Sequence, residues 1–234
     1  MSPREKAKEI IDGAIKEGRK YLMEYESKMV CQAYGLPVAR SVIARTAEEA
    51  VKLSREIGYP VVLKIASPDV IHKTDVGGVI VGVKNDEEVV KAYEKIMENV
   101  KKHKPDARII GVLVQEMAPQ STEVIVGMVR DSQFGPAIMF GLGGIFVEIL
   151  KDVSFRIAPL TPGDAREMIQ EIKAYPVLKG YRNLPPADID ALVDVILKTS
   201  QLSLENPEVS QLDLNPIFVY EKGAKIVDAR IILG

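Results

Sequence analysis

Two oxygen-bearing side chains near the C-terminus, Asp213 and Asn215, have the types and the spacing of a metal site. They lie in residues 211–217, Gln-Leu-Asp-Leu-Asn-Pro-Ile, where polar and apolar residues alternate as in a strand with one packed face. Leu212 and Leu214 then face the core, while Asp213 and Asn215 share the other face, about 7 Å apart by the usual rise per residue. Oxygen ligands suit Mg²⁺, which keeps part of its water shell for phosphate. A strand whose polar face is only solvated would show the same pattern.

A lysine inside an apolar strand pattern is the second chemical signal. Lys64 lies in residues 61–65, Val-Val-Leu-Lys-Ile, which follow the helix-ending turn Gly-Tyr-Pro at 58–60. A buried ammonium without an anionic partner loses its proton or costs several kcal/mol, so Lys64 requires an anion such as phosphate. The alternative is an exposed edge strand from which the lysine reaches water.

Glycine pairs supply a third signal, because they let a backbone approach a ligand and offer N–H groups to phosphate. Gly77 and Gly78 end a polar, turn-rich loop over residues 67–78, and Gly143 and Gly144 end the segment Gly-Leu-Gly-Gly after a later strand. The second segment departs from both the Walker and the dinucleotide glycine patterns, so neither of those arguments applies to it.

Composition excludes several classes of function. The 234 residues are 47% apolar, which is ordinary for a globular protein, and 31 basic against 33 acidic residues leave a formal charge of −2. This balance argues against nucleic acid and membrane surfaces as partners but allows a local anion site. The apolar runs are too short to span a bilayer and the N-terminus has no signal-peptide core, so we expect a cytoplasmic protein. The single cysteine, Cys31, forms no intrachain disulfide and is predicted to be buried packing.

Periodicity, caps and turns predict the elements that must position these groups. The chain changes from helix-rich to strand-rich near Gln115, Glu116 and Met117, so a cleft between two lobes is predicted there. We expect a helical extension over residues 1–35, a first lobe over 36–110 and an antiparallel-rich second lobe over 111–234. Two predicted helices end at residues 18 and 35, and four others cover 47–57, 85–104, 162–174 and 187–204. The predicted strands cover 61–65, 79–83, 109–115, 123–130, 136–140, 147–150, 155–159, 211–219 and 225–233.

Together these features resemble the ATP-grasp fold, an α+β (α/β) fold in which two α+β lobes clasp ATP and magnesium. Three segments are similar to the ATP-grasp (β) subunit of the archaeal ADP-forming acetyl-CoA (acyl-CoA) synthetases. They are Ile-His-Lys-Thr-Asp at 71–75 with Gly77-Gly78, Gly-Leu-Gly-Gly at 141–144, and Leu-Asp-Leu-Asn-Pro at 212–216. The resemblance extends from residue 28 to the end of the chain.

The resemblance implies the reversible conversion of an acyl-CoA, ADP and phosphate to the acid, CoA and ATP, through an acyl phosphate and phosphohistidine. Mg²⁺ is the implied cofactor, and ATP or ADP the implied substrate. A CoA-binding α subunit that carries the first phosphorylated histidine is the implied partner, without which the chain is inactive, in an α2β2 heterotetramer. His72 would take the phosphoryl group and deliver it to ADP, because one imidazole nitrogen attacks phosphorus near neutral pH while the other is held by a hydrogen bond. A loop histidine that caps Asp69 or Asp75 is the alternative.

The resemblance also implies roles for the other residues in phosphoryl transfer, which depends on positioning and charge neutralisation. For Arg156, an ion pair with Glu148 or Asp152 is an equal alternative to a contact with phosphate. The side chain of Glu116 would be only a charge at the rim of the nucleotide site. The implied roles are Lys64 on the α- or β-phosphate, Gly77 and Gly78 as a lid with Gly143 and Gly144 behind it, backbone groups of Gln115, Glu116 and Met117 on adenine, Glu123 on the ribose, Arg156 on phosphate, and Asp213 and Asn215 on magnesium.

Two other functions are compatible with the same motifs. A free-standing ATP-grasp ligase that activates a carboxylate directly would need no histidine in the loop, so His72 distinguishes it from the synthetase subunit. A nucleotide-sensing regulatory module would bind ADP without passing phosphate to it. The sequence leaves the acyl group open, because the acid and CoA would bind to the partner chain.

Overall fold

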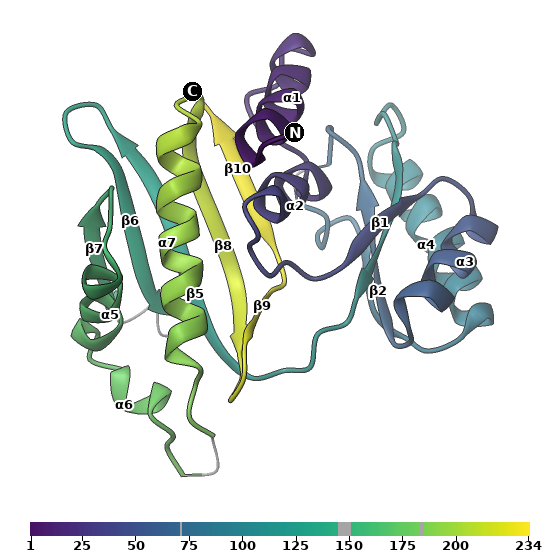
Figure 1. The fold of residues 1–234 in the computed structure, drawn as a ribbon. Helices are drawn as coiled ribbons and strands as arrows, with labels where there is room; N and C mark the ends of the chain where they lie inside the picture. The colour runs from purple at the N-terminus through teal and green to yellow at the C-terminus, as the bar shows by residue number, and fades with distance from the viewer. Residues whose placement is uncertain (71, 145–150, 183–184) are drawn as a thin grey trace. The chain divides into compact units, whose positions relative to one another are not determined.

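The computed structural model describes residues 1–70, 72–144, 151–182 and 185–234 and divides the chain into two compact units (Figure 1). The central unit is Ala39–Ala118, and the composite unit joins Met1–Val38 to Pro119–Gly234. No helix among the described residues is long and apolar enough to cross a membrane.

These boundaries differ from the predicted ones at 35/36 and 110/111. Strand β4, Gly111–Glu116, pairs with β1 and β2 of the central unit, so the first lobe ends after this strand. The N-terminal helices belong with the C-terminal half, because Leu22 donates its backbone N–H to Ile231 over 3.0 Å and Leu233 donates to Lys20 over 2.8 Å. Both boundaries therefore depend on hydrogen bonds between segments that lie far apart in the sequence.

The central unit is a four-stranded antiparallel sheet in the order β1-β4-β2-β3 with two helices packed on one face. Leu63 and Ile65 of β2 pack into the core with α3 and α4, whereas Lys64 faces the other way. Thr46 and Asn85 accept backbone N–H groups at the starts of the two helices, as their sequence positions predict. The elements are β1 Ser41–Ala44, α3 Ala47–Ile57, β2 Val61–Ala66, β3 Val79–Val83, α4 Asp86–His103 and β4 Gly111–Glu116.

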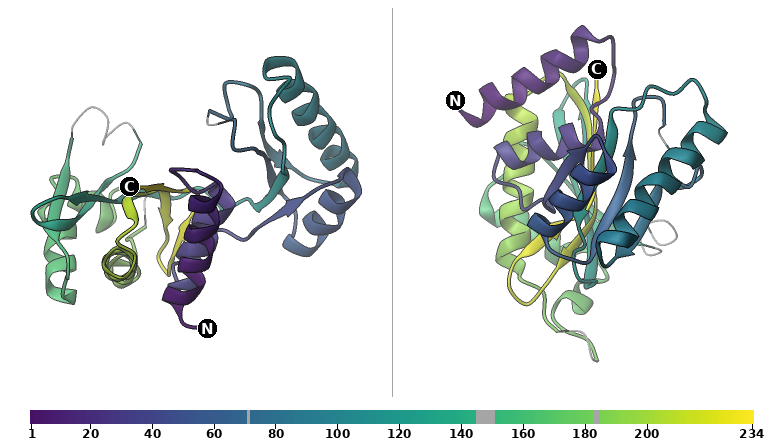
Figure 2. Two further views of the ribbon diagram at one scale, coloured as in Figure 1. Left: turned by 90° about the horizontal axis from the view of Figure 1, so that it is seen from above. Right: turned by 90° about the vertical axis from the view of Figure 1, so that its right-hand side faces the viewer.

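The composite unit contains an antiparallel sheet in the order β10-β8-β5-β6-β7, with β9 paired to β8. Helices α5 and α7 lie on the same side of this sheet (Figure 2, left). The predicted strand 147–150 lies outside the described residues. The elements are α1 Pro3–Lys16, α2 Glu24–Ala33, β5 Thr122–Asp131, β6 Gly135–Leu142, β7 Val153–Ile157, α5 Pro162–Glu171, α6 Tyr175–Leu178, α7 Ile189–Glu205, β8 Val209–Val219, β9 Ala224–Ile226 and β10 Ala229–Leu233.

Alternation along β5 distinguishes the two faces of the composite sheet. Val124, Val126 and Met128 are buried in the core that includes α5 and α7, which defines the helix face. Glu123 and Gly127 therefore point to the opposite face, which we call the ligand face. Residues opposite each other in an antiparallel pair share a face, so the strand register identifies which side chains lie together there.

A buried ion pair holds the end of α1 to α2. Arg19 donates to both carboxylate oxygens of Glu26 over 2.6 and 2.8 Å, and the two side chains are only 9% and 12% exposed. The Glu26 carboxylate raises the pKa of Arg19 further above its ordinary value. Glu26 also accepts the backbone N–H of Met23 at the start of α2.

Breaking this pair is expected to destabilise the chain strongly. Arg19→Ala leaves the Glu26 carboxylate buried without its cation, so the free energy of unfolding should fall by about 3 kcal/mol. Lys8→Ala is the matched control on α1, because the Lys8–Asp12 pair is exposed and should contribute less than about 1 kcal/mol. Urea unfolding followed by circular dichroism measures both, and equal losses in the two variants would contradict the account.

Candidate functional site

The central unit supports the prediction that Lys64 is a buried cation. It is 8% exposed, and its strand β2 lies between β3 and β4, so the edge-strand alternative is wrong. Lys64 is opposite Leu113 of β4, and Gln115 lies two residues further along the same strand. Lys64 and Gln115 therefore share the face of the central sheet that points away from α3 and α4.

Gly77 and Gly78 close the turn of the loop that contains His72. Gly77 donates to the carbonyl of Thr74 over 3.0 Å, and Gly78 donates to that of Lys73 over 2.7 Å. A Cβ at Gly78 would lie 2.6 Å from the Ile65 side chain, so the close approach requires glycine. Both N–H groups bond within the loop in this conformation, which gives the glycines a structural role, and their expected role as a lid over phosphates stays a prediction.

His72 is exposed on this loop. In the described part of the chain its ring makes no hydrogen bond or ion pair. Asp69, which the sequence offered as a partner, accepts the backbone N–H of Arg108 over 2.6 Å, and its own carbonyl accepts from Lys104 over 2.7 Å. The capping alternative therefore has no support, and the imidazole is accessible to a reacting group.

The segment Gln115 to Met117 ends strand β4. Gln115 is buried, whereas Met117 is exposed just beyond the strand. Glu116 is bound to the backbone of Arg40 twice, because its N–H donates to the Arg40 carbonyl over 2.8 Å and its carboxylate accepts the Arg40 N–H over 3.0 Å. Its side chain therefore anchors β1 to β4 and is more than a rim charge, and its N–H is not available to a ligand.

On the ligand face of the composite sheet, Asp213 and Asn215 point away from the core as predicted. Leu212 and Leu214 are buried and the two polar side chains are exposed. Asp213 is opposite Gly127 on β5 and opposite Arg230 on β10. The predicted alternation of this strand is confirmed.

Asp228 joins these two residues, and the sequence reasoning missed it. The backbone N–H of Asn215 donates to the carbonyl of Asp228 over 3.3 Å, and the neighbouring pair Leu214–Ala229 fixes the register. Loss of hydration and the negative charge of Asp228 together raise the pKa of Asp213, against a smaller opposing effect of Arg230. The last hairpin was the signal in the sequence that could have identified Asp228. When residues 211–219 pair with the strand after the turn, Asp228 comes opposite Asn215.

This trio of side chains fits a hard divalent cation. Two carboxylates and one carboxamide offer oxygen ligands and leave coordination positions for water and phosphate. Loss of hydration is the first cause of the raised pKa of Asp213, and the negative charge of Asp228, which a bound cation would neutralise, is the second. No group of three or more His, Cys, Asp or Glu side chains that could hold a metal occurs in the described residues, so the carboxamide of Asn215 is needed to complete the set.

Glu123 and the second glycine pair come together at one end of the ligand face. Gly143 donates its N–H to the Glu123 carbonyl over 2.8 Å, and a Cβ at Gly143 would lie 3.0 Å from the Glu123 Cβ. Gly144 has a positive φ of 65°, and a Cβ there would lie 3.5 Å from a carboxylate oxygen of Glu123. Glycine at both positions places no side chain against half-buried Glu123.

Arg156 does not join this site. It is opposite Ile138, a core residue of β6, so its side chain points to the helix face. There its guanidinium pairs with Glu171 over 2.9 Å and with Glu167 over 3.8 Å, both on α5. The predicted partner Asp152 instead accepts two backbone N–H groups at residues 173 and 174, and Glu148 lies outside the described residues. Strand alternation, which the sequence reasoning did not apply to this residue, explains the correction.

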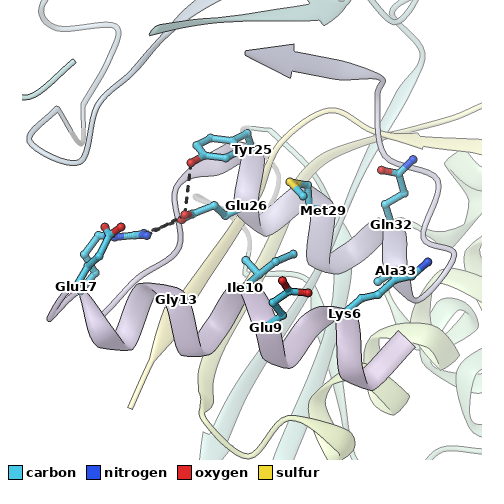
Figure 3. Close-up of a pocket in the computed structure, with 11 residues that line it drawn as sticks. Lys6, Glu9, Ile10, Gly13, Glu17, Tyr25, Glu26, Met29, Gln32 and Ala33 are labelled. Atoms are coloured by element: carbon cyan, nitrogen blue, oxygen red, sulfur yellow. Dashed lines mark hydrogen bonds and ion pairs between the residues drawn. The ribbon is translucent and has the colours of Figure 1, made fainter. Parts of the chain in front are cut away.

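An open cavity of about 680 Å³ lies between α1 and α2 (Figure 3). Ile10, Met29 and Ala33 form its apolar part, and the Arg19–Glu26 pair lies at one end. None of the predicted site residues lines this cavity. It is therefore separate from the residues that the sequence indicated.

Comparison with known proteins gives consistent matches over nearly the whole chain. A family model described as an ATP-grasp domain matches residues 13–233. The β subunit of ADP-forming acetate–CoA ligase I of Pyrococcus furiosus is 58% identical over 228 residues, which cover 97% of this chain and 98% of that protein.

Two solved structures of the dinucleotide forming acetyl-coenzyme A synthetase 1 of Ca. Korarchaeum cryptofilum are also similar. One, in complex with coenzyme A, Ca-AMPCP and HgCl⁺, is 53% identical with a TM-score of 0.94. The other, with coenzyme A and Mg-AMPPCP, has its phosphohistidine segment pointing towards the nucleotide binding site and is 50% identical with a TM-score of 0.88. Each comparison covers 97% of this chain and 100% of the other.

Proposed function

Because this chain belongs to the ATP-grasp family and, within it, to the β subunits of the ADP-forming acetate–CoA ligases, we propose that it passes a phosphoryl group to Mg-ADP in such an enzyme. The overall reaction converts an acyl-CoA, ADP and phosphate to the acid, CoA and ATP, and it is reversible. The observation that carries the phosphoryl-transfer role is the exposed ring of His72, which makes no hydrogen bond or ion pair within the described residues.

His72 acts as the phosphoryl carrier in this proposal. A ring nitrogen of His72 attacks the phosphorus of the phosphohistidine on the partner subunit, so that one P–N bond breaks and another forms. A β-phosphate oxygen of ADP then attacks the same phosphorus, the P–N bond to His72 breaks, and the released imidazole takes up a proton. Imidazole suits both steps because it is partly neutral at physiological pH and leaves readily from phosphorus.

The ligand face of the composite unit holds the metal. Asp213, Asn215 and Asp228 supply its oxygen ligands, and bound Mg²⁺ neutralises charge on the phosphates during transfer. The structure of the relative with Mg-AMPPCP supports Mg²⁺ as the cofactor and ATP or ADP as the substrate.

Other residues bind the nucleotide without taking part in bond changes. Lys64, buried in the central sheet, supplies a positive charge for the α- or β-phosphate. The backbone of Met117, an exposed residue just beyond the end of β4, contacts adenine next to Gln115. Glu123, against which Gly143 and Gly144 place no side chain, accepts hydrogen bonds from the ribose hydroxyls.

The partner is a CoA-binding α subunit that carries the first phosphorylated histidine. The name of the Pyrococcus furiosus relative, a β subunit, supports a second chain, and the phosphohistidine segment of the Korarchaeum structure supports the histidine. We propose an α2β2 assembly in the cytoplasm, where acyl-CoA and ADP are available. Neither the free-standing ligase nor the sensor module explains why an accessible histidine lies in this loop.

Arg156→Gln tests the assignment of the two sheet faces. The affinity for Mg-ADP should change by less than about twofold, because substitutions away from a site usually stay within about 0.5 kcal/mol. Isothermal titration calorimetry with Mg-ADP measures this directly. A loss of tenfold or more would place Arg156 at the nucleotide after all.

Reconstitution tests the function as a whole. The chain is mixed with the α subunit of the Pyrococcus furiosus enzyme, acetyl-CoA, ADP, phosphate and Mg²⁺, and ATP is measured with luciferase. ATP that requires both chains and the acyl-CoA supports the synthetase subunit. ATP-dependent carboxylate activation by the chain alone would support the free-standing ligase, and Mg-ADP binding without any phosphate transfer would support the sensor.

A further inference from the structure

Arg230 lies on the ligand face beside the proposed metal ligands. It is directly opposite Asp213 in the β8–β10 pair, and it is exposed while its neighbours Ala229 and Ile231 are buried. Cross-strand partners of this kind have Cβ atoms about 5 Å apart. The positive charge of Arg230 opposes the rise in the pKa of Asp213, so the two side chains interact electrostatically.

The guanidinium of Arg230 is uncommitted. In the parts of the chain that the structure describes it makes neither an ion pair nor a hydrogen bond. Several other arginines of the composite unit are engaged: Arg19 with Glu26, Arg156 with Glu171, and Arg166 with Asp190. An unengaged arginine next to two carboxylates is therefore not explained by the packing of the fold.

The spacing of the side chains on the ligand face suits a phosphate that bridges the metal and Arg230. Asn215 and Asp228 form one cross-strand row, and Asp213 and Arg230 form the next row, about 7 Å further along the strands by the rise per residue. A metal held by the first row together with Asp213 binds phosphate oxygens through its open positions. The guanidinium fork can then bind the outer oxygens of the same phosphoryl group, a geometry for which arginine is suited and lysine is not.

We propose that Arg230 is a catalytic residue that binds the phosphoryl group in transit, which is the γ-phosphate of ATP, and not the two phosphates of ADP. This rests on the proposed function, since it assigns a further residue to the same reaction. Asp213 lies opposite the arginine without forming an ion pair with it among the described residues, so the guanidinium can move. The arginine moves onto the phosphoryl group when Mg-ATP binds or forms.

A comparison of two nucleotides on one variant tests the proposal. Arg230→Gln should weaken the binding of Mg-AMPPCP at least about tenfold, because a charge-assisted contact to the γ-phosphate is lost, and should leave Mg-ADP binding within about twofold. Arg230→Lys should fall between Arg230→Gln and the unchanged chain, since it keeps the charge without the fork. Calorimetry on the full chain gives both affinities, and circular dichroism shows whether the variants are folded.

Arg166→Gln is the matched control, an exposed arginine of the same unit that pairs with Asp190 on the helix side. It should bind both nucleotides as the unchanged chain does. Equal losses for Mg-AMPPCP and Mg-ADP in Arg230→Gln, or no loss for either, would overturn the role of Arg230 while leaving the proposed function intact. Failure of the unchanged chain to bind either nucleotide would instead contradict the proposed function and this inference with it.

Discussion

His72→Ala is expected to lower the rate of ATP formation at least about 1000-fold, because removal of a group that forms a covalent intermediate eliminates the catalysed route. The affinity for Mg-ADP should change by less than about twofold, since His72 is exposed on its loop and its ring makes no hydrogen bond or ion pair with the described part of the chain. ATP synthesis is measured with the partner subunit, acetyl-CoA, ADP and phosphate. Nucleotide affinity is measured separately by calorimetry.

The other histidine of the chain provides the matched control. His103 lies at the end of α4, where its ring contacts the carbonyl of Asn99 over 2.8 Å. His103→Ala should retain full activity. If His72→Ala also retains full activity, the phosphoryl group reaches ADP without this residue, and transfer comes directly from the partner's histidine or the chain is a different ligase.

Asp228→Asn is expected to weaken Mg²⁺-dependent binding of ADP by about 10- to 100-fold, the range seen when carboxylates around metal sites are altered. Asparagine keeps the acceptor for the Ala229 backbone N–H over 2.9 Å, so the hairpin should stay intact. Titration with Mg²⁺ at fixed ADP measures the effect, and ADP binding in the absence of metal should not change. Asp190→Asn, on an exposed carboxylate of α7, is the control.

The pKa of Asp213 provides a second test of Asp228→Asn that needs no metal. The charge of Asp228 contributes to the raised pKa of Asp213, so the pKa of Asp213 should fall towards its ordinary value in Asp228→Asn. Carbon-detected NMR titration of the aspartate side chains follows this shift. An unchanged Asp213 pKa together with unchanged Mg²⁺ dependence would remove Asp228 from the metal site.

Local patterns in the sequence predicted the parts of the site that depend on one strand. Asp213 and Asn215 lie on one face because alternation within β8 is a local property. Lys64 is buried because apolar residues surround it on a strand with two neighbours. The ATP-grasp fold predicted from the combined motifs is confirmed by the family match and by the similar structures.

Features that depend on pairing between distant segments could not be predicted in the same way. Strand register determines three such features: Asp228 lies opposite Asn215, Arg156 points to the helix face, and β4 belongs to the central unit. Register is fixed by turns and by the burial of whole strands, so no single residue carries that information. Hydrogen bonds within the loop also gave Gly77 and Gly78 a structural role that their sequence could not distinguish from ligand binding.

The central claim, phosphoryl exchange between His72 and Mg-nucleotide on this chain, concerns a reversible half-reaction that involves neither CoA nor the acid. It can therefore be measured without the partner, although the overall reaction needs both chains. The purified chain is incubated with Mg-ATP labelled in the γ-phosphate, and the modified peptide is identified by mass spectrometry. An acid-labile, base-stable label is expected on the peptide containing His72, and this label should return to ATP when Mg-ADP is added. Absence of label, or label that persists in His72→Ala, would contradict the central claim.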